Sequence, residues 1–192
     1  AIVDIMEANA ARTAEEIGRG AIAVACDVSD RASVAAMKAE VNHRLGAVSV
    51  VIANAGVTVF EELTEMSDAD VDWVIDVSLY GVTHCAQAFL PDMIAAREGH
   101  IVATASAAAL MAPFVGEHAP YCAAKAGIIG MIMSLRADLG KYNVGASVLC
   151  PGAVQSQISG SPRYRPAQYG GPRDAVATMP ADVREIGRPA VE

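Results

Sequence analysis

The chain has 192 residues, 53% of them hydrophobic, and a formal charge of −8. The length predicts a single domain with a real core, and so apolar a composition excludes a disordered chain. The acidic balance argues against nucleic acid or an anionic membrane as the main partner. No apolar run reaches the roughly 18 residues of a membrane span. Scattered cysteines and the absence of a leading signal segment favour a cytoplasmic protein.

Short apolar runs recur along the chain. Each run is too short for a buried helix and is bounded by turn-forming residues, so each predicts a strand. Their near-continuous apolarity is typical of strands covered on both faces, as in a parallel sheet. The predicted strands cover residues 1–5, 21–26, 48–53, 101–105 and 144–150.

Helical patterns separate these strands. An apolar stripe at helical spacing predicts a helix that ends at Gly46, and Ser67 with Asp70 forms a capping-box pattern at the start of a long helix toward Ala95. A further helix is predicted from about 119 to 139. Strands that alternate with helices predict a doubly wound α/β sheet, in which ligands bind at the carboxyl ends of the strands.

The composition changes after the last predicted strand. Residues 159–180 are dense in Gly, Pro, Ser and Arg, which predicts a loop or lid at the end of a single domain that covers residues 1–192. Four residues of this loop are candidates for contact with a polar or anionic substrate, although a solvated loop is the simpler expectation: Arg163, Tyr164, Arg165 and Tyr169.

Polar residues follow the first three predicted strands. Asp4 lies where a carboxylate can accept hydrogen bonds from a ribose diol, although acidic residues also favour the first turn of a helix. Asp27-Val28 closes the second strand, where a helix-entry turn is an equally good interpretation. Asn54-Ala55-Gly56 follows the third strand, where a tight turn is the alternative. Every one of these candidates for ligand binding therefore has a structural alternative.

A sharper signal lies further along the chain. Tyr121 and Lys125 are four residues apart on a predicted helix and share one face. A phenol has a pKa near 10, and a neighbouring ammonium stabilises the phenolate and lowers that pKa. Ser106, at the end of the preceding strand, can hydrogen-bond a carbonyl or hydroxyl oxygen. Together with Pro151-Gly152 at the next strand end, these residues form a specific combination.

The sequence resembles the short-chain dehydrogenase/reductase family over residues 1–158. Asp27-Val28, Asn54-Ala55-Gly56, Ser106, Tyr121 to Lys125 and Pro151 to Val154 occur in that family's order and approximate spacing. The resemblance implies a Rossmann-like fold and an oxidoreductase that interconverts a secondary alcohol and a ketone by hydride transfer with NAD(P).

The same resemblance implies roles for single residues. Tyr121 is expected to be the catalytic acid/base, Lys125 to lower its pKa and bind the nicotinamide ribose, and Ser106 to position the substrate oxygen. The other implied cofactor contacts are Asp27 and Val28 at the adenine, Asn54 with Ala55 and Gly56 beside the cofactor, Pro151 and Gly152 at the strand end, and Val154 and Ser156 at the carboxamide. Asp4 matches the acid on the adenosine ribose of NAD-preferring members, so we expect NAD rather than NADP.

The chain departs from the family pattern between the motifs. Ser78 stands where the family carries an Asn that holds a water linked to the lysine. We expect a slower proton relay, which Ser78→Asn speeds up; the alternative is that Ser78 only packs in its helix.

The segment between Ser106 and Tyr121 is longer than usual, and we expect it to form part of the pocket wall. Its His118 is expected to be a partly exposed loop histidine without a role, with substrate contact as the alternative.

The largest departure is at the start. The family opens with a strand and a glycine-rich loop that binds the pyrophosphate, and neither has a counterpart here. That strand is central in the family's sheet, and a final helix and strand are also lacking. We therefore expect a fragment with an incomplete sheet that binds dinucleotide poorly.

Other functions and partners follow from these observations. A catalytically silent binding or scaffold protein is one alternative, which Ser78 favours, and a cofactor-free relative that performs elimination or dehalogenation is another, which the retained motifs oppose. The helices around 71–93 and 119–139 are apolar over much of their circumference, and the matching helices of the family pair across a two-fold axis. We expect a homodimer or homotetramer; the alternative is that these helices are buried only against their own sheet.

Overall fold

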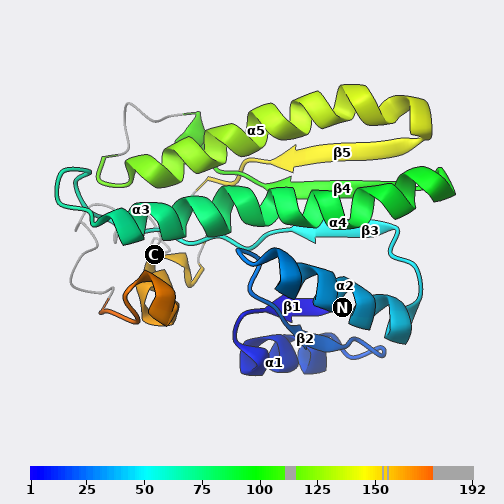
Figure 1. The fold of residues 1–192 in the computed structure, drawn as a ribbon, viewed down its shortest axis with the longest axis horizontal. Coiled ribbons are helices and arrows are strands. Elements are labelled where there is room, and N and C mark those ends of the chain that lie inside the picture. The colour runs from blue at the N-terminus through cyan, green and yellow to red at the C-terminus, as the bar shows by residue number, and fades with distance from the viewer. Residues whose placement is uncertain (111–115, 153, 155, 175–192) are drawn as a thin grey trace, which may run out of the picture. The chain divides into compact units, whose positions relative to one another are not determined.

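The computed structural model describes residues 1–110, 116–152, 154 and 156–174 (Figure 1). Strands and helices alternate along this part of the chain in the predicted order. Their bounds are β1 Ile2–Asp4, α1 Glu7–Ile17, β2 Ala23–Ala25, α2 Arg31–Leu45, β3 Val50–Ala53, α3 Asp68–Ile75, α4 Gly81–Ala96, β4 Gly99–Thr104, α5 Ala119–Leu139 and β5 Val144–Leu149.

The chain forms two compact units. The first comprises residues 1–55, 80–103 and 132–147, and the second comprises residues 56–79, 104–131 and the chain from 148 onward. The first unit therefore holds β1, β2, β3 and α4, whereas the second holds α3 and the segments that follow β3, β4 and β5. Short 3-10 turns occur in the second unit at Ala107–Ala109 (η2), Ile158–Tyr164 (η5) and Ala167–Tyr169 (η6).

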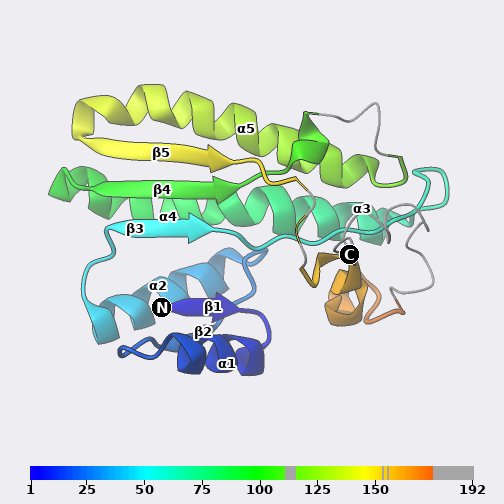
Figure 2. The same cartoon turned by 180° about the vertical axis from the view of Figure 1, so that it is seen from behind.

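The strands form two parallel sheets. β1 pairs with β2 so that Val3 lies opposite Val24, and β3 pairs with β4 so that Val51 lies opposite Ile101. The second sheet has the order β3-β4-β5, and Figure 2 shows its three strands running in the same direction. Within the described residues no strand pairing joins the two sheets. The predicted parallel α/β fold with an incomplete sheet is confirmed.

Local signals in the sequence set the helix ends. The Asp30 carboxylate caps α2 by accepting a hydrogen bond from the Ala32 amide at 2.9 Å. Gly46 ends the same helix with a φ of +84°, a conformation that strains other residues. The Ser67 hydroxyl caps α3 by accepting a hydrogen bond from the Asp70 amide at 3.2 Å. The predicted ends at Gly46 and Ser67 are therefore confirmed.

The long helix predicted from Ser67 toward Ala95 is present and contains one irregular turn. Between α3 and α4 the backbone forms a π-helical turn at Asp76–Tyr80. Such turns are rare and occur frequently at functional sites. Ser78, one of the predicted site residues, lies in the middle of this turn. The predicted long helix is therefore confirmed, with a π-helical turn at the position where a candidate residue is placed.

The core of the first unit follows most of the predicted apolar stripe, whose last residue, Leu45, is exposed. Val34, Met37 and Val41 of α2 are buried, and α2 packs against α4 while α1 packs against β1 and β2. α4 begins at Gly81, where a Cβ would stand 2.7 Å from Cγ2 of Val28. The start of α4 can therefore approach the segment after β2 only without a side chain at this position.

No helix among the described residues is long and apolar enough to cross a membrane. The cysteines are free thiols, and Cys26, Cys85 and Cys122 are buried while Cys150 is half-buried. In the same part of the chain no group of three or more His, Cys, Asp or Glu residues is placed to hold a metal ion.

Candidate active site

The residues predicted to act in catalysis lie together in the second unit. Ser78 comes from the π-helical turn, Ser106 lies two residues beyond β4, and Tyr121 and Lys125 occupy successive turns of α5. Backbone pairing continues beyond β4, because the Ala107 amide donates to the Pro151 carbonyl at 2.8 Å. Ser106 is held at the start of η2, where its hydroxyl accepts a hydrogen bond from the Ala108 amide at 3.2 Å.

Tyr121 is the centre of this group. Its side chain is 8% exposed. Burial raises the pKa of Tyr121 above its ordinary value, and the interaction with the nearby Ser106 side chain lowers it by a smaller amount. Tyr121 therefore keeps its proton at neutral pH and is ready to donate it.

Lys125 is buried beside the tyrosine. Its side chain is 2% exposed, its Nζ lies 5.5 Å from the centroid of the Tyr121 ring, and it donates a hydrogen bond to the Thr104 carbonyl at 2.7 Å. Burial lowers the pKa of Lys125 to about 8. The expected lowering of the tyrosine pKa by Lys125 is not seen, because burial dominates the pKa of Tyr121 and Ser106 alone lowers it.

Gly56 and Ser78 complete the surroundings of Lys125. A Cβ on Gly56 would stand 3.0 Å from Lys125 Nζ and 3.7 Å from Ser78 Oγ, so a side chain here would crowd the ammonium group. The Ser78 hydroxyl accepts a hydrogen bond from the Val57 amide and donates one to the Val57 carbonyl, both at 3.1 Å. Ser78 is fully buried and holds the loop after β3, which favours the packing alternative over the water relay.

The predicted adenine-side residues lie in the first unit. The Asp4 carboxylate accepts a hydrogen bond from the Met6 amide at 2.8 Å, and the Asp27 carboxylate accepts one from the Ser29 hydroxyl at 2.6 Å. Both carboxylates therefore form local turns, and for Asp27 a turn is the structural alternative that the sequence left open. His84 Nδ1 lies 2.9 Å from the Val28 carbonyl. Asn54 and Ala55 follow β3 with exposed side chains.

The predicted nicotinamide-side residues follow β5. The Pro151 carbonyl binds the Ala107 amide, as described above, and Gly152 is exposed. Val154 is also exposed, and the Ser156 hydroxyl accepts a hydrogen bond from the Ile158 amide at 3.4 Å. The structure therefore groups Gly56, Ser78, Ser106, Tyr121 and Lys125 tightly and leaves Val154 and Ser156 on the surface.

His118 differs from its expectation. It was predicted as a partly exposed loop histidine, but its side chain is only 5% exposed. The imidazole stacks on Phe60 with 5.0 Å between ring centroids and is tilted against Tyr121 at 5.2 Å. The only feature of the sequence that could have placed His118 in the site is its position three residues before Tyr121. No feature of the sequence indicates its contact with Phe60. Pro113 and Phe114 of the same segment lie outside the described residues.

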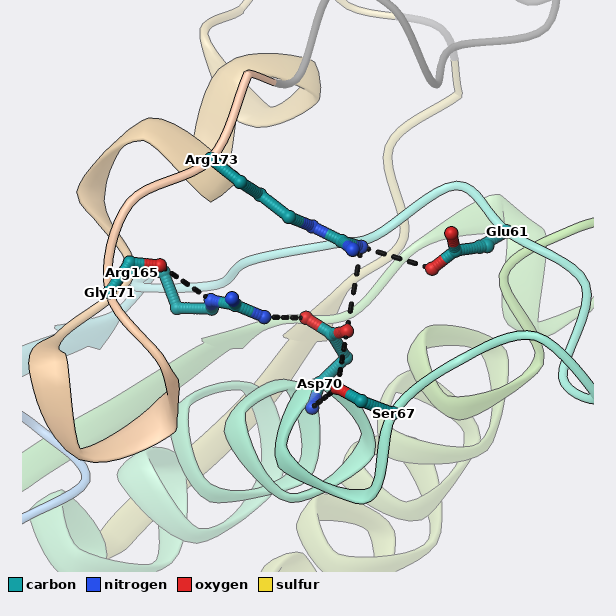
Figure 3. Close-up of polar contacts among 6 residues, drawn as sticks. All are labelled: Glu61, Ser67, Asp70, Arg165, Gly171 and Arg173. Carbon is teal, nitrogen blue, oxygen red and sulfur yellow. Dashed lines mark hydrogen bonds and ion pairs between the residues drawn. The ribbon is translucent and has the colours of Figure 1, made fainter.

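Ion pairs and hydrogen bonds hold the predicted substrate loop (Figure 3). Residues 175–180 of this loop lie outside the described chain. The Arg165 guanidinium pairs with the buried Asp70 carboxylate and donates to the Gly171 carbonyl at 2.8 Å. Arg173 lies 3.5 Å from the same carboxylate and 3.1 Å from that of Glu61. We call Glu61, Ser67, Asp70, Arg165, Gly171 and Arg173 the loop network.

Other members of the proposed substrate cluster are also used within the protein. The Tyr169 hydroxyl donates to Asp76 at 2.8 Å, and Arg163 Nε donates to the Gly160 carbonyl at 3.2 Å. The Arg163 guanidinium lies 5.6 Å from the centroid of the Tyr164 ring. These contacts give the loop its own structure, so its charges are not evidence for an anionic substrate.

A parallel α/β fold that brings a serine after β4 together with a Tyr-x-x-x-Lys pair on α5 defines the class of short-chain dehydrogenases. The sequence family described as short chain dehydrogenase matches residues 1–165, and the chain belongs to that family. It is a family of oxidoreductases, as the resemblance implied.

Known relatives match most of this chain. It is 37% identical over 158 residues to a C alpha-dehydrogenase of a Sphingobium species, covering 81% of this chain and 51% of that protein. It is 36% identical over 153 residues to the oxidoreductase UcpA of Escherichia coli, covering 78% of this chain and 58% of that protein. The chain thus spans about half to three fifths of the length of these relatives.

A solved structure shows the same fold. The short chain dehydrogenase/reductase from Burkholderia phymatum, crystallised in complex with NAD, superposes with a TM-score of 0.85 and 32% sequence identity. The match covers 96% of this chain and 67% of that chain.

Proposed function

We propose that this chain is part of an NAD(P)-dependent oxidoreductase that interconverts a secondary alcohol and a ketone, with Tyr121 as the acid/base. The observation that carries the proposal is the buried Tyr121 beside the buried Lys125, whose Nζ lies 5.5 Å from the centroid of the tyrosine ring, with the Ser106 side chain close enough to lower the tyrosine pKa. Tyr121 would supply a proton, Ser106 a hydroxyl that binds oxygen, and Lys125 a cation. The three residues lie close together in a chain of a dehydrogenase family.

The residues beside Lys125 suit a nicotinamide ribose. An ammonium group has three N–H donors, and the Thr104 carbonyl accepts from one of them at 2.7 Å. Gly56 provides room at this point, because a Cβ there would stand 3.0 Å from Nζ. A nicotinamide bound here would supply or accept the hydride. Lys125 would then hold the ribose hydroxyls.

The chain's own residues would carry the proton. In reduction, the protonated Tyr121 donates its phenol proton to the carbonyl oxygen as that oxygen gains negative charge. The Ser106 hydroxyl donates a hydrogen bond to the same oxygen, and a donor that is already in place costs little reorganisation. In oxidation, Tyr121 accepts the alcohol proton, which requires the phenolate and therefore becomes easier as the pH rises.

NAD is the cofactor that Asp4 favours. A carboxylate at the end of β1 would accept hydrogen bonds from an adenosine ribose diol and would repel a 2′-phosphate. The resemblance to NAD-preferring members, rather than any contact of Asp4 in the structure, supports this part of the proposal.

The test is a cofactor and substrate screen of the gene's full-length product. Ketones, the oxidised forms of secondary alcohols, are supplied with NADH or with NADPH, and the absorbance of the reduced cofactor is followed. We expect turnover of at least one ketone, with a higher kcat/KM for NADH than for NADPH. Failure to oxidise either cofactor with any ketone would contradict the proposal.

A catalytically silent binding protein is the second candidate. The observation that favours it is the Ser78 hydroxyl, which binds both polar groups of the Val57 backbone at 3.1 Å and so has no evident role in a water relay. Calorimetric binding of NADH together with the absence of turnover would support this second function.

A further inference from the structure

His118 is a buried polar residue whose hydrogen-bonding groups are not used. Its side chain is 5% exposed, and among the residues that the structure describes neither Nδ1 nor Nε2 has a hydrogen-bond partner. Buried polar groups are nearly always paired, so an unpaired one in a folded protein calls for a specific explanation. A ligand that supplies the missing partner is one such explanation.

The position of the imidazole is set by packing. One face stacks on Phe60 with 5.0 Å between ring centroids, and the ring is tilted by 31° against Tyr121 at 5.2 Å. The backbone on both sides is fixed as well. The Glu61 amide donates to the Glu117 carbonyl at 2.6 Å, and the Cys122 amide donates to the His118 carbonyl at 3.1 Å. The ring is thus held beside the proposed acid/base without a hydrogen bond of its own.

The chemistry of the imidazole limits what it can bind. Burial lowers the pKa of His118, so the ring is neutral at pH 7. A neutral imidazole has one N–H donor and one acceptor nitrogen. It therefore suits a hydroxyl or a carbonyl oxygen and cannot form an ion pair with a carboxylate. Because its ring lies within 5.2 Å of the Tyr121 ring, that oxygen belongs near the carbon that Tyr121 serves.

We infer that His118 is a specificity-determining residue that hydrogen-bonds a second oxygen of the substrate, a hydroxyl or carbonyl close to the reacting carbon. This inference rests on the proposed function of Tyr121. It predicts a substrate of the hydroxyketone or diol type, in preference to a simple ketone or alcohol of the same carbon skeleton. Phe60 contributes by stacking on the imidazole ring.

The experiment compares matched substrates on the gene's full-length product. 3-Hydroxy-2-butanone and 2-butanone, and larger pairs that differ in the same hydroxyl, are reduced with NADH by the wild-type protein and by His118→Phe. A site that hydrogen-bonds a substrate hydroxyl discriminates strongly against the analogue that lacks it. We expect His118→Phe to lower kcat/KM for the hydroxyketones by about 10-fold to 100-fold. Its effect on the simple ketones should stay within about 3-fold.

Two further variants serve as controls. His118→Gln supplies N–H donors and a carbonyl acceptor and is expected to recover part of the preference for hydroxyketones. His43→Phe replaces an exposed histidine of α2 and should change neither substrate's kcat/KM. Equal losses on both members of each pair, or the absence of a hydroxyketone preference in the wild-type protein, would overturn the inference.

A binding measurement separates this inference from the proposed reaction. If no ketone is reduced, the proposed function fails, and the shift in Tm caused by 2,3-butanediol is then compared with that caused by 2-butanol. A larger shift with the diol that disappears in His118→Phe would support His118 as the site of the second oxygen. Equal shifts in the two proteins would refute it.

Discussion

Burial moves the pKa values of Tyr121 and Lys125 in opposite directions, and in both residues it favours the neutral form. The pKa of the tyrosine is raised, and that of the lysine is lowered to about 8. A buried charge is costly unless it is paired. The free protein therefore holds a phenol that keeps its proton next to an amine that loses its proton readily.

The first prediction concerns Tyr121. Because burial raises its pKa, phenolate absorbance from Tyr121 in the free protein is expected only above pH 10, the ordinary range for tyrosine. The measurement is an ultraviolet titration of the wild-type protein minus that of Tyr121→Phe. Phenolate that forms below pH 9 would show instead that Lys125 controls the tyrosine, as the family resemblance implies.

The second prediction concerns the stability that Lys125 costs. Below pH 8 the lysine is protonated in both the folded and the unfolded protein, so the folded state bears the full cost of a buried ammonium. Between about pH 8 and the unfolded pKa near 10.4 only the unfolded chain still binds the proton, so stability rises with pH. Lys125→Met has no such dependence.

The stability difference between these two proteins should therefore change with pH. We expect the wild-type protein to gain on the order of 3 kcal/mol relative to Lys125→Met between pH 8 and pH 10.4. Urea unfolding at a series of pH values measures this difference. A constant difference over that range would mean that Lys125 keeps an ordinary pKa in the folded protein.

At the scale of elements, the features set by local sequence were predictable. Gly46 and Ser67 end and begin helices because a glycine accepts positive φ and a serine hydroxyl caps a free amide. The π-helical turn at Asp76–Tyr80 was not predictable, since no residue there signals an extra backbone position. The short apolar strand runs were also recognised, with bounds that differ by a few residues.

Contacts between distant segments were the other part that the sequence did not reveal. Arg165 and Asp70 are 95 positions apart, and neither the capping-box pattern of Asp70 nor the loop position of Arg165 indicates that the two residues pair. The burial of His118 depends on Phe60 in the same way. Within the site, the Ser106, Tyr121 and Lys125 group was predictable because a strand end and one helix face bring them together. The hydrogen bonds between the Ser78 hydroxyl and the Val57 backbone were not predictable from the sequence.

The third prediction concerns the loop network of Figure 3. Asp70 is 1% exposed and faces both Arg165 and Arg173. Asp70→Asn removes the charge that both guanidinium groups share, and breaking a buried pair in this way costs about 3–5 kcal/mol. We expect that loss in urea unfolding, together with faster proteolysis within residues 158–174.

An exposed ion pair provides the control. Arg44 and Glu40 pair at 2.9 Å on the surface of α2, with side chains 42% and 48% exposed. Glu40→Gln should change stability by less than about 0.5 kcal/mol. If Asp70→Asn costs no more than this control, the loop network does not stabilise the second unit.

At the scale of the whole molecule, we propose that the protein forms a homodimer or homotetramer through α5. The exposed residues of this helix include several small or apolar ones, among them Ala123, Ala126, Gly130 and Met133. Short side chains let a second helix approach closely, and a two-fold axis would pair this face with its own copy. The matching helices of the family pair in this way.

The fourth prediction follows from that proposal. Ala126→Asp places a charge within the exposed face of α5 and is expected to convert the oligomer to monomers in light scattering of the full-length gene product. Ala36→Asp, at an exposed alanine of α2, should leave the mass unchanged. A monomeric wild-type protein would contradict the proposal.

The central claim is that Tyr121 transfers the proton that accompanies hydride transfer. The most direct test is kcat/KM for reduction of the best ketone by the full-length gene product, compared between Tyr121→Phe and Tyr142→Phe. Tyr142 follows α5 and lies in the first unit, outside the catalytic group. We predict a loss of about 10²-fold to 10⁴-fold for Tyr121→Phe and no loss for Tyr142→Phe. Equal activity of the two variants would contradict the account.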